Sequence, residues 1–391
     1  MVVRPLDLLD LDDLLSDDER AARALARQVA NDHIRPDVAE WYENGNPPIR
    51  DLALELGKAG LFGMHLTGYG CAGVSTVSYG LACMELEAAD SGIRSLVSVQ
   101  GSLVMYAIWR YGSDEQKNRW LPALAAGRSI GCFGLAEPDH GSDPTGMSTR
   151  ARRDGDDWVL DGVKTWILNA PIADVAVIWA RADKGIAGFV VPTGTPGLTT
   201  REFRHTMSLR ASSVGELVLD GLRLPESARL PAARSLMAPL SCLTEARLSI
   251  IFGVLGAARD CLDATLDYAA GREQFGQPIS AFQLTQAKFA DMSLELQKGF
   301  LLALHLCRLR DATGKPLRPE QVSVGKLNNV RESIEIARQC RTILGGNGIR
   351  GELPVMRHAS NLESVLTYEG TSEIHQLSIG QKLTGLNAFS R

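Results

Sequence analysis

The feature that most constrains the fold is a change of sequence pattern that occurs twice along the 391-residue chain. Residues 1–129 have helical periodicity, residues 130–234 contain short β-type runs separated by turns, and residues 235–391 return to helical periodicity. A chain of this length is too long for one hydrophobic core. We therefore expect an α+β multidomain protein with an N-terminal helical domain, a middle antiparallel β domain and a C-terminal helical domain, divided at these boundaries.

A capping box marks the start of the first long helix. Ser16 precedes Asp17, and Glu19 lies three residues after Ser16. In such a box the serine hydroxyl and the glutamate carboxylate each accept a hydrogen bond from the backbone of the other residue. Further helical runs are expected at residues 51–59, 76–90 and 96–111.

The middle region contains short runs that favour β-strands. They are Trp158–Leu160, Val175–Trp179, Gly188–Val191 and Glu216–Leu219. Segments rich in Gly, Asp and Pro separate these runs, and turns at short spacing favour antiparallel pairing. No helical pattern alternates with the runs, which argues against a parallel nucleotide-binding sheet.

Apolar residues repeat every three to four positions in the last third of the chain. The clearest stripe comprises Phe289, Met292, Leu296, Phe300 and Leu304. This spacing places the five side chains on one helix face, which we expect to form the core of an antiparallel bundle.

Composition argues against several classes of function. The formal net charge is −5 and there is no basic block, which disfavours nucleic-acid binding. No uninterrupted apolar run reaches the roughly 18 residues of a membrane span, so no membrane association is expected. The N-terminus is acidic, unlike a signal peptide or a transit peptide.

The seven cysteines are scattered and form no CxxC pair. An odd, dispersed set indicates reduced thiols in a cytoplasmic protein rather than a disulfide framework. No Cys/His spacing fits a zinc site, so no metal is expected.

Glu369 is the best candidate for a catalytic group. It lies between Tyr368 and Gly370, just after an apolar segment. A carboxylate in a dry pocket has a raised pKa and can act as a general base near neutral pH. The pattern alone also permits an ordinary surface or capping carboxylate.

Arg94 is the second candidate and lies between two predicted helices. An arginine at a helix start can bind a carboxylate or a phosphate through paired hydrogen bonds. The alternative is an internal ion pair with Glu87, seven residues earlier and about two helical turns away.

Other segments have the composition of a cofactor site, although each also suits ordinary packing. The segment Phe133–Asp143 gathers glycine, proline and hydroxyl residues at the entry to the β domain. Trp166 could stack on a planar ring. Arg272 follows a predicted helix and could meet a phosphate, or it could serve as a cation at the helix C-terminus.

Taken together, these segments resemble the acyl-CoA dehydrogenase family, and within it most closely the glutaryl-CoA dehydrogenases. The resemblance covers nearly the whole chain, and many motifs at matching spacing are more specific than any single one. They include Asp90-Ser91-Gly92 with Arg94-Ser95, Phe133-Gly134-Leu135, Gly141-Ser142-Asp143-Pro144, Leu209-Arg210-Ala211-Ser212, Gln274-Phe275-Gly276, Leu344-Gly345-Gly346-Asn347-Gly348 and Thr367-Tyr368-Glu369-Gly370-Thr371.

The resemblance implies a β-barrel-like middle domain, a C-terminal four-helix bundle and a homotetramer. It also implies FAD between the β domain and the bundle, completed by a neighbouring subunit. Residues that match FAD-contacting positions are Phe133, Leu135, Ala136, Ser142, Trp166, Leu168, Asn169, Arg272, Phe275, Gln283, Leu344, Gly345, Gly346, Thr371 and Glu373. Residues that match substrate-binding positions are Glu87, Arg94, Ser95, Ser142, Arg247, Tyr368 and Gly370.

The implied reaction begins with removal of the α-proton of an acyl thioester by Glu369. The β-hydrogen would leave as hydride to the flavin, and the backbone N–H of Glu369 would help to polarise the thioester carbonyl. Arg94 would hold a distal carboxylate, and decarboxylation could follow. The acyl group would be carried by CoA or a carrier protein, and electrons would pass to an electron-transfer flavoprotein or to oxygen.

Two positions depart from the family pattern on the flavin side. Ala136 replaces the threonine of a Thr-Glu-Pro motif, and Leu168 replaces the threonine of Trp-Ile-Thr-Asn. In the family those hydroxyls hydrogen-bond the isoalloxazine, and neither alanine nor leucine can do so through its side chain. This favours an alternative: Glu369 abstracts the α-proton, and elimination or cyclisation follows without net oxidation, in a specialised biosynthetic pathway. A non-catalytic flavin scaffold would need neither Glu369 nor Arg94.

Overall fold

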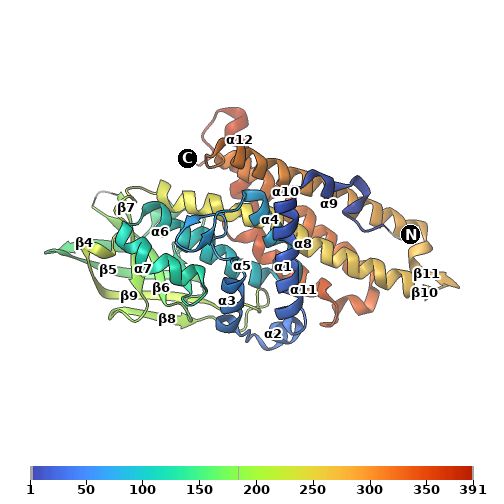
Figure 1. The fold of residues 1–391 in the computed structure, drawn as a ribbon, viewed down its shortest axis with the longest axis horizontal. Coiled ribbons are helices and arrows are strands. Elements are labelled where there is room, and N and C mark those ends of the chain that lie inside the picture. Colours follow the sequence, from blue (N-terminus) through green and yellow to red (C-terminus); the bar gives the residue numbers. More distant parts are fainter. Residues whose placement is uncertain (1–2, 184, 390–391) are drawn as a thin grey trace.

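The computed structural model describes residues 3–183 and 185–389 (Figure 1). A β-sheet lies at one end of the elongated molecule, and long helices extend from it to the other end. The N-terminal part consists of η1 (Asp7–Leu9), η2 (Leu11–Leu14), α1 (Asp17–His33), α2 (Val38–Asn44), α3 (Ile49–Lys58), β1 (Thr67–Gly68), β2 (Cys71–Ala72), α4 (Thr76–Ala89), α5 (Ser91–Ser98), the π-helical η3 (Val99–Met105), α6 (Tyr106–Tyr111) and α7 (Asp114–Ala125).

The predicted helix start at Ser16 is confirmed, whereas the run expected at 96–111 begins earlier, at Ser91, so Arg94 lies within α5 and not between two helices. Ser16 Oγ accepts from Glu19 N at 3.3 Å, and the Glu19 carboxylate accepts from Ser16 N at 2.9 Å, which completes the capping box before α1. Asp90 caps α5, its carboxylate accepting from Gly92 N at 2.7 Å. The helix that carries Arg94 therefore begins where the chain turns sharply out of α4.

The middle part is one seven-stranded sheet in the order β3-β6-β4-β5-β9-β8, with β7 paired to β6. Its strands are β3 (Gly131–Gly134), β4 (Arg150–Asp154), β5 (Asp157–Leu168), β6 (Val175–Ala182), β7 (Gly185–Pro192), β8 (Leu198–Glu202) and β9 (Val214–Pro225). A 3-10 turn, η4 (Pro144–Gly146), precedes β4, and η5 (Glu226–Ala228) follows β9.

The expectation of purely antiparallel pairing is wrong in one respect, because β6 pairs in parallel with β3 and, through Arg150 and Arg181, with β4. Turn residues in the sequence predict the pairing only of strands that a hairpin joins. The chain segments between β3 and β6, and between β4 and β6, each contain another strand, so their pairing does not depend on a local turn. All remaining strand pairs that the structure describes in this sheet are antiparallel.

The C-terminal part is a helical bundle. It comprises α8 (Met237–Gly271), β10 (Glu273–Gln274), β11 (Gln277–Pro278), η6 (Ile279–Ala281), α9 (Gln283–Thr313), α10 (Pro319–Ile343), η7 (Gly345–Ile349), α11 (Pro354–Thr367) and α12 (Ser372–Thr384). The predicted stripe on α9 is confirmed as core, with Met292, Leu296 and Phe300 almost fully buried. Phe300 meets Phe252 of α8 edge to face, with ring centroids 5.6 Å apart.

Helix α8 is long and apolar enough by average composition to cross a membrane, although charged residues interrupt its apolar run. An 18-residue window of this helix has a mean hydropathy of 1.5, but 78% of that window is buried inside the protein. Every residue of α4 is also buried, and Gly256 lets α8 approach the backbone of α4 at Met84. The apolar length of α8 therefore reflects a central core helix that packs closely against α4.

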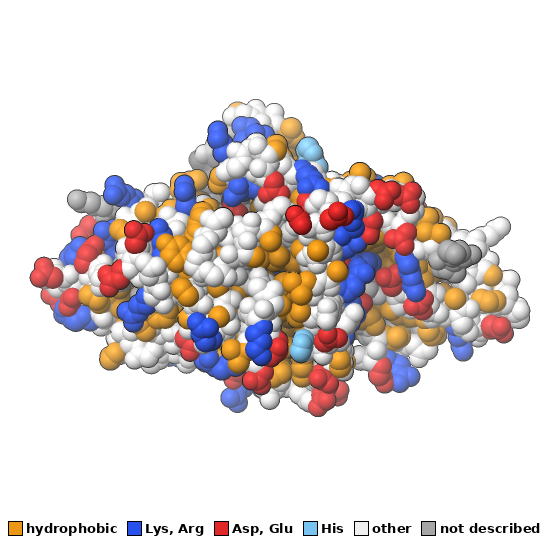
Figure 2. All heavy atoms as spheres, viewed as in Figure 1, with side chains coloured by type: hydrophobic (Ala, Val, Ile, Leu, Met, Phe, Trp, Pro, Cys, Tyr) orange, Lys and Arg blue, Asp and Glu red, His pale blue; other side chains and the backbone are white. Residues whose placement is uncertain are grey.

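On the face shown in Figure 2, acidic and basic side chains are interspersed rather than gathered by sign.

Candidate active site

Glu369 lies in the short connection between α11 and α12. Its backbone is left-handed, with φ 53°, and Gly370 follows with φ 98°. A Cβ on Gly370 would lie 3.0 Å from His375 Nε2, so glycine is required both by the backbone and by the space. The hydroxyl of Thr371 then caps α12. A two-residue turn thus projects the Glu369 side chain between the ends of two helices.

The Glu369 carboxylate is buried without a matching donor. Its Oε2 atom is inaccessible to solvent and has no hydrogen-bond partner among the residues that the structure describes. Burial raises the pKa of Glu369, although the positive charges of Arg94, Arg247 and Lys326 oppose this. A carboxylate in this environment is suited to accept a proton from carbon.

Cations hold the carbonyl side of the same turn. Arg247 on α8 donates from Nε to the Glu369 carbonyl at 2.7 Å. Lys326 on α10 donates to the carbonyls of Tyr368 and Gly370, each at 2.7 Å. By contrast, the backbone N–H of Glu369 donates to no acceptor within residues 3–183 and 185–389. That N–H is free to polarise a carbonyl oxygen of a bound molecule.

Arg94 is fully buried and makes three contacts inside the protein. Its Nε donates to Glu87 Oε2 at 2.6 Å, its Nη1 donates to Ser98 Oγ at 3.1 Å, and its Nη2 donates to the Tyr368 hydroxyl. Burial opposes the positive charge, but Glu87 and Tyr368 keep the pKa of Arg94 well above its usual value. The structure therefore contains the internal ion pair that the sequence left open as an alternative.

The ion pair does not use all the polar groups around it. Arginine has five N–H donors, and three contacts leave two of them for a ligand. Glu87 Oε1 and Ser95 Oγ are also buried without hydrogen-bond partners in the described part of the chain. Since native proteins rarely bury unpaired polar atoms, this cluster has the character of a ligand site.

Gly253 on α8 packs directly against this cluster. A Cβ at this position would collide with Glu87 Oε2 and would lie 3.2 Å from Arg94 Nε. The absence of a side chain on Gly253 is therefore a condition for the Glu87–Arg94 pair. Sequence reasoning did not identify Gly253, because its contacts are between helices that are far apart in the chain.

The first group of predicted flavin residues lies on the β domain. Trp166, with φ 56°, is 67% exposed, and its ring contacts Phe203 edge to face at 4.7 Å. Asn169 donates to the Gly131 carbonyl, while its buried Oδ1 has no partner in the described residues. An exposed indole and an unpaired amide oxygen three residues apart in the sequence suit a planar, hydrogen-bonding cofactor. Phe133, by contrast, is buried against Trp179, so its backbone rather than its ring is available.

The remaining residues of this group are more accessible. Leu135, Ala136 and Leu168 are partly exposed, and Ser142 is exposed. The Ala136 carbonyl accepts from Thr165 N at 3.0 Å, so its backbone belongs to the sheet. The side chains of Ala136 and Leu168 supply no hydrogen bond to this surface.

The second group lies at the opposite end of the molecule. The β10–β11 hairpin carries Arg272 at its base and Phe275 at its tip, far from the sheet (Figure 1). Phe275 is 95% exposed with φ 53°, and Gln283 is exposed at the start of α9. Leu344 is buried, whereas Gly345 and Gly346 are exposed. Within one copy of the chain, the hairpin and the sheet therefore lie at opposite ends of the molecule.

Thr371 and Glu373 differ from both groups, because they lie just after Glu369. Thr371 is used as the cap of α12, and Glu373 is exposed in the first turn of that helix.

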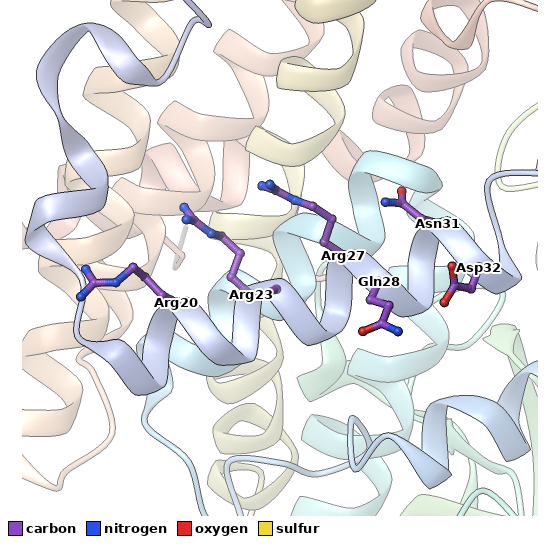
Figure 3. Close-up of a pocket in the computed structure, with 7 residues that line it drawn as sticks. Arg20, Arg23, Arg27, Gln28, Asn31 and Asp32 are labelled. Atoms are coloured by element: carbon purple, nitrogen blue, oxygen red, sulfur yellow. The ribbon is translucent and has the colours of Figure 1, made fainter.

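A surface cavity of about 290 Å³ on α1 is not part of this site (Figure 3). Its arginines Arg20, Arg23 and Arg27 bind Asp17, Asp12 and Glu85, respectively. These carboxylates neutralise the cavity's positive charge. Among the described residues, no group of three or more His, Cys, Asp or Glu side chains could hold a metal ion.

Comparison with known proteins accounts for this architecture. Profiles of the N-terminal, middle and C-terminal domains of acyl-CoA dehydrogenases match residues 16–128, 132–222 and 236–384. The chain belongs to the acyl-CoA dehydrogenase family. Members of this family are FAD-dependent oxidoreductases that act on CH–CH bonds.

Three relatives within the family show which acyl-CoA dehydrogenases this chain resembles. A crystal structure of glutaryl-CoA dehydrogenase from Mycobacterium smegmatis is 66% identical over the full length of both chains, with a TM-score of 0.98. Another crystal structure of a glutaryl-CoA dehydrogenase from Mycobacterium smegmatis, in complex with FADH2, is 61% identical to this chain over the full length of both chains. Its TM-score is also 0.98. Human mitochondrial short-chain specific acyl-CoA dehydrogenase is 36% identical, with 93% of this chain and 87% of that protein covered.

Lys326, which contacts the Glu369 turn, is another residue that sequence reasoning did not identify. It lies between Val322 and Val330 at four-residue spacing, and both valines are buried. A lysine on the apolar face of a predicted helix is unusual, because an isolated buried cation is costly. That position was the available signal, although it could not show which groups the lysine meets.

Proposed function

We propose that this acyl-CoA dehydrogenase oxidises a thioester whose acyl chain ends in a carboxylate, as in glutaryl-CoA. The observation that carries the proposal is the contact between Arg94 and Tyr368, the residue next to Glu369. It places a buried cation with spare donors one residue from a carboxylate whose Oε2 atom is buried and unpaired. Similarity to glutaryl-CoA dehydrogenases supports the same substrate class.

Glu369 removes the α-proton in this proposal. Its N–H polarises the thioester carbonyl, so that negative charge developing on that oxygen meets a fixed donor. Bound FAD would supply the oxidising chemistry, in which the β-hydrogen leaves as hydride. The spare Arg94 donors and the Ser95 hydroxyl hold the distal carboxylate, which sets the distance between the α-carbon and Glu369. Loss of that carboxylate as CO2 is a further step that the same enoyl product permits.

The flavin site is proposed to need more than one copy of the chain. Trp166 and Asn169 of one copy would contact the isoalloxazine, while Arg272, Phe275 and Gln283 of another would reach the rest of FAD. The separation of the hairpin from the sheet supports this, as does the almost complete exposure of the Phe275 ring. A homotetramer, as the family resemblance implies, would supply these copies.

Cellular context is part of the same proposal. All seven cysteines are free, and six of them are buried, which suits a reducing cytoplasm. Arg247 and Ser142 would face the thioester arm of CoA or of a carrier protein. Electrons would pass to an electron-transfer flavoprotein or to oxygen.

Non-oxidative chemistry is the second candidate. The observation that favours it is the lack of side-chain hydrogen-bond donors at Ala136 and Leu168. Glu369 would still abstract the α-proton, and the carbanion would expel or displace a leaving group within the acyl chain. In that case the product forms while the flavin stays oxidised.

One experiment separates the two candidates. The purified holoenzyme is mixed anaerobically with glutaryl-CoA, butyryl-CoA and other acyl-CoA thioesters, and flavin absorbance is followed. Rapid bleaching by glutaryl-CoA that is lost in Arg94→Ala supports the dicarboxylate dehydrogenase. A flavin that remains oxidised while the thioester is consumed supports the non-oxidative reaction instead.

A further inference from the structure

Lys326 is a buried cation that the proposed reaction does not yet use. It lies in the middle of α10 and is 1% exposed. Its ammonium donates to the carbonyls of Val365 at 3.1 Å, Tyr368 at 2.7 Å and Gly370 at 2.7 Å. The three acceptors lie on both sides of Glu369. Three carbonyl acceptors need three N–H donors, which only the protonated amine has.

The position of these carbonyls at the end of α11 explains why a cation is needed there. The last carbonyls of a helix have no partner within that helix, and here the end of α11 lies next to Glu369. The negative end of the helix dipole would also disfavour a carboxylate at this place. Lys326 satisfies the carbonyls and supplies the opposite charge. Glu369 itself has a left-handed φ of 53°, which costs about 1 kcal/mol or more for a non-glycine residue.

We propose that Lys326 is a positioning residue for proton abstraction, an inference that rests on Glu369 being the base. By holding the carbonyls of Tyr368 and Gly370 on one side of the turn, Lys326 keeps the Glu369 N–H on the other side, free for the thioester oxygen. Its charge also favours the ionised form of the Glu369 carboxylate. Lys326 thus acts on both parts of the step, the base and the oxyanion donor, without touching the substrate.

The charges around Lys326 agree with this role. Burial, together with the positive charges of Arg247 and Arg94, lowers the pKa of Lys326 to about 7, although the Glu369 carboxylate opposes this. His375 on α12 is also titratable and lies beside this turn, and burial lowers its pKa to about 3, so it is neutral near pH 7. The Tyr368 ring lies 5.8 Å from the Lys326 ammonium, and burial raises the pKa of the Tyr368 hydroxyl to about 12. Glu369 is therefore the anion whose ionisation responds to Lys326.

The test measures proton abstraction alone. In 3-thiaglutaryl-CoA a sulfur atom replaces the β-carbon, so no β-hydride can leave, and deuterium uptake at the α-carbon in D2O reports only on the base. Exchange is followed by mass spectrometry with the holoenzyme from about pH 5 to about pH 9. We expect Lys326→Met to slow exchange at neutral pH by about 30-fold. We also expect it to move the midpoint of the pH profile upward by about one unit, because a nearby positive charge is lost.

Three comparison variants make the result specific. Lys326→Arg retains the charge and should leave the midpoint within about 0.3 units of the wild type. Asn329→Leu, one turn along α10, removes a buried side chain that bonds to Ile251 and Gly299 instead, so its midpoint should not move. Glu369→Gln should abolish exchange. If wild type and Glu369→Gln exchange equally, the proposed base is wrong. If Glu369→Gln abolishes exchange while Lys326→Met keeps the wild-type rate and midpoint, the role of Lys326 alone is overturned.

A second route covers a Lys326→Met variant that does not fold. Lys326→Gln keeps two N–H donors without the charge, and the upward shift of the midpoint is expected for it as well. A crystal structure of the wild-type holoenzyme with 3-thiaglutaryl-CoA provides a measurement that needs no variant. The thioester oxygen is expected within hydrogen-bond distance of Glu369 N, with Lys326 on the three carbonyls. A thioester oxygen bound elsewhere would overturn the proposal.

Discussion

Arg94 donates from Nε to Glu87 Oε2 at 2.6 Å, and neither side chain is exposed to solvent. A buried ion pair of this kind contributes little net stability, because the desolvation of both charges offsets their attraction. The main effect of the pair is to orient the Arg94 guanidinium. With Nε on Glu87 and Nη2 on Tyr368, the guanidinium is fixed in a plane, and its remaining donors are aimed before any ligand arrives.

Replacing Arg94 by alanine should remove the preference for dicarboxylic substrates. We expect kcat/KM for glutaryl-CoA to fall by about 10³-fold, or about 4 kcal/mol, and that for butyryl-CoA to fall far less. Steady-state kinetics with both thioesters measure the difference. Because the single variant leaves Glu87 buried without its partner, Arg94→Ala combined with Glu87→Gln is the matched control. Equal losses for the two substrates in that double variant would contradict the assignment.

Gly253→Ala should disturb the same pair from the opposite side. The new Cβ would collide with Glu87 Oε2, and overpacking of this kind typically costs about 1–3 kcal/mol of stability. We expect Gly253→Ala to lower the ratio of glutaryl-CoA to butyryl-CoA turnover. Gly256→Ala, one turn later on α8, would instead collide with the Met84 carbonyl. It should destabilise the fold without changing that ratio, as thermal melts and kinetics of the two variants would reveal.

Glu369→Gln should eliminate turnover while the fold is retained. A general base contributes about 10²–10⁴-fold to rate, and an amide cannot accept the α-proton. Anaerobic flavin bleaching by glutaryl-CoA should become at least about 10²-fold slower, with unchanged FAD content. Bleaching at the wild-type rate would show that another group removes the proton.

Activity and stability should respond to pH in opposite directions at Glu369. Burial raises the pKa of Glu369 in the folded protein above its value in the unfolded chain. Between the two pKa values the folded state holds more protons, so this group's contribution to stability is present below the unfolded pKa and is lost as pH rises through the folded pKa. Proton abstraction, which needs the carboxylate, increases over the same interval. Melting temperatures of wild type and Glu369→Gln should therefore diverge as pH rises, with the glutamine variant becoming relatively more stable.

Restoring a hydroxyl at Leu168 should alter the flavin directly. We expect Leu168→Thr to shift the two-electron reduction potential of bound FAD by roughly 30 mV, which corresponds to about 1.4 kcal/mol and to one added hydrogen bond. Spectroelectrochemical titration measures this without any substrate. Leu168→Val, similar in shape to threonine but without a hydroxyl, is the control, and the same shift in both variants would exclude a hydrogen-bond effect.

The capping box at Ser16 and the apolar stripe on α9 were predicted correctly because both are local. A helix start depends on residues three positions apart, and a buried face depends on spacing along one helix. The parallel pairing of β3 with β6 was missed because it joins segments more than forty positions apart, from Gly131 to Val175, with no turn between them to report it.

The sequence by itself determined which residue is the candidate base and which arginine accompanies it, because Glu369 and Arg94 lie in short segments whose order matches a known family. Only the tertiary structure decided what surrounds them. Lys326 meets carbonyls that lie 39 to 44 positions away in the chain, and Gly253 makes room for Glu87 from another helix. Periodicity shows that a helix face is buried, but the partners of that face follow from the packing of the whole chain.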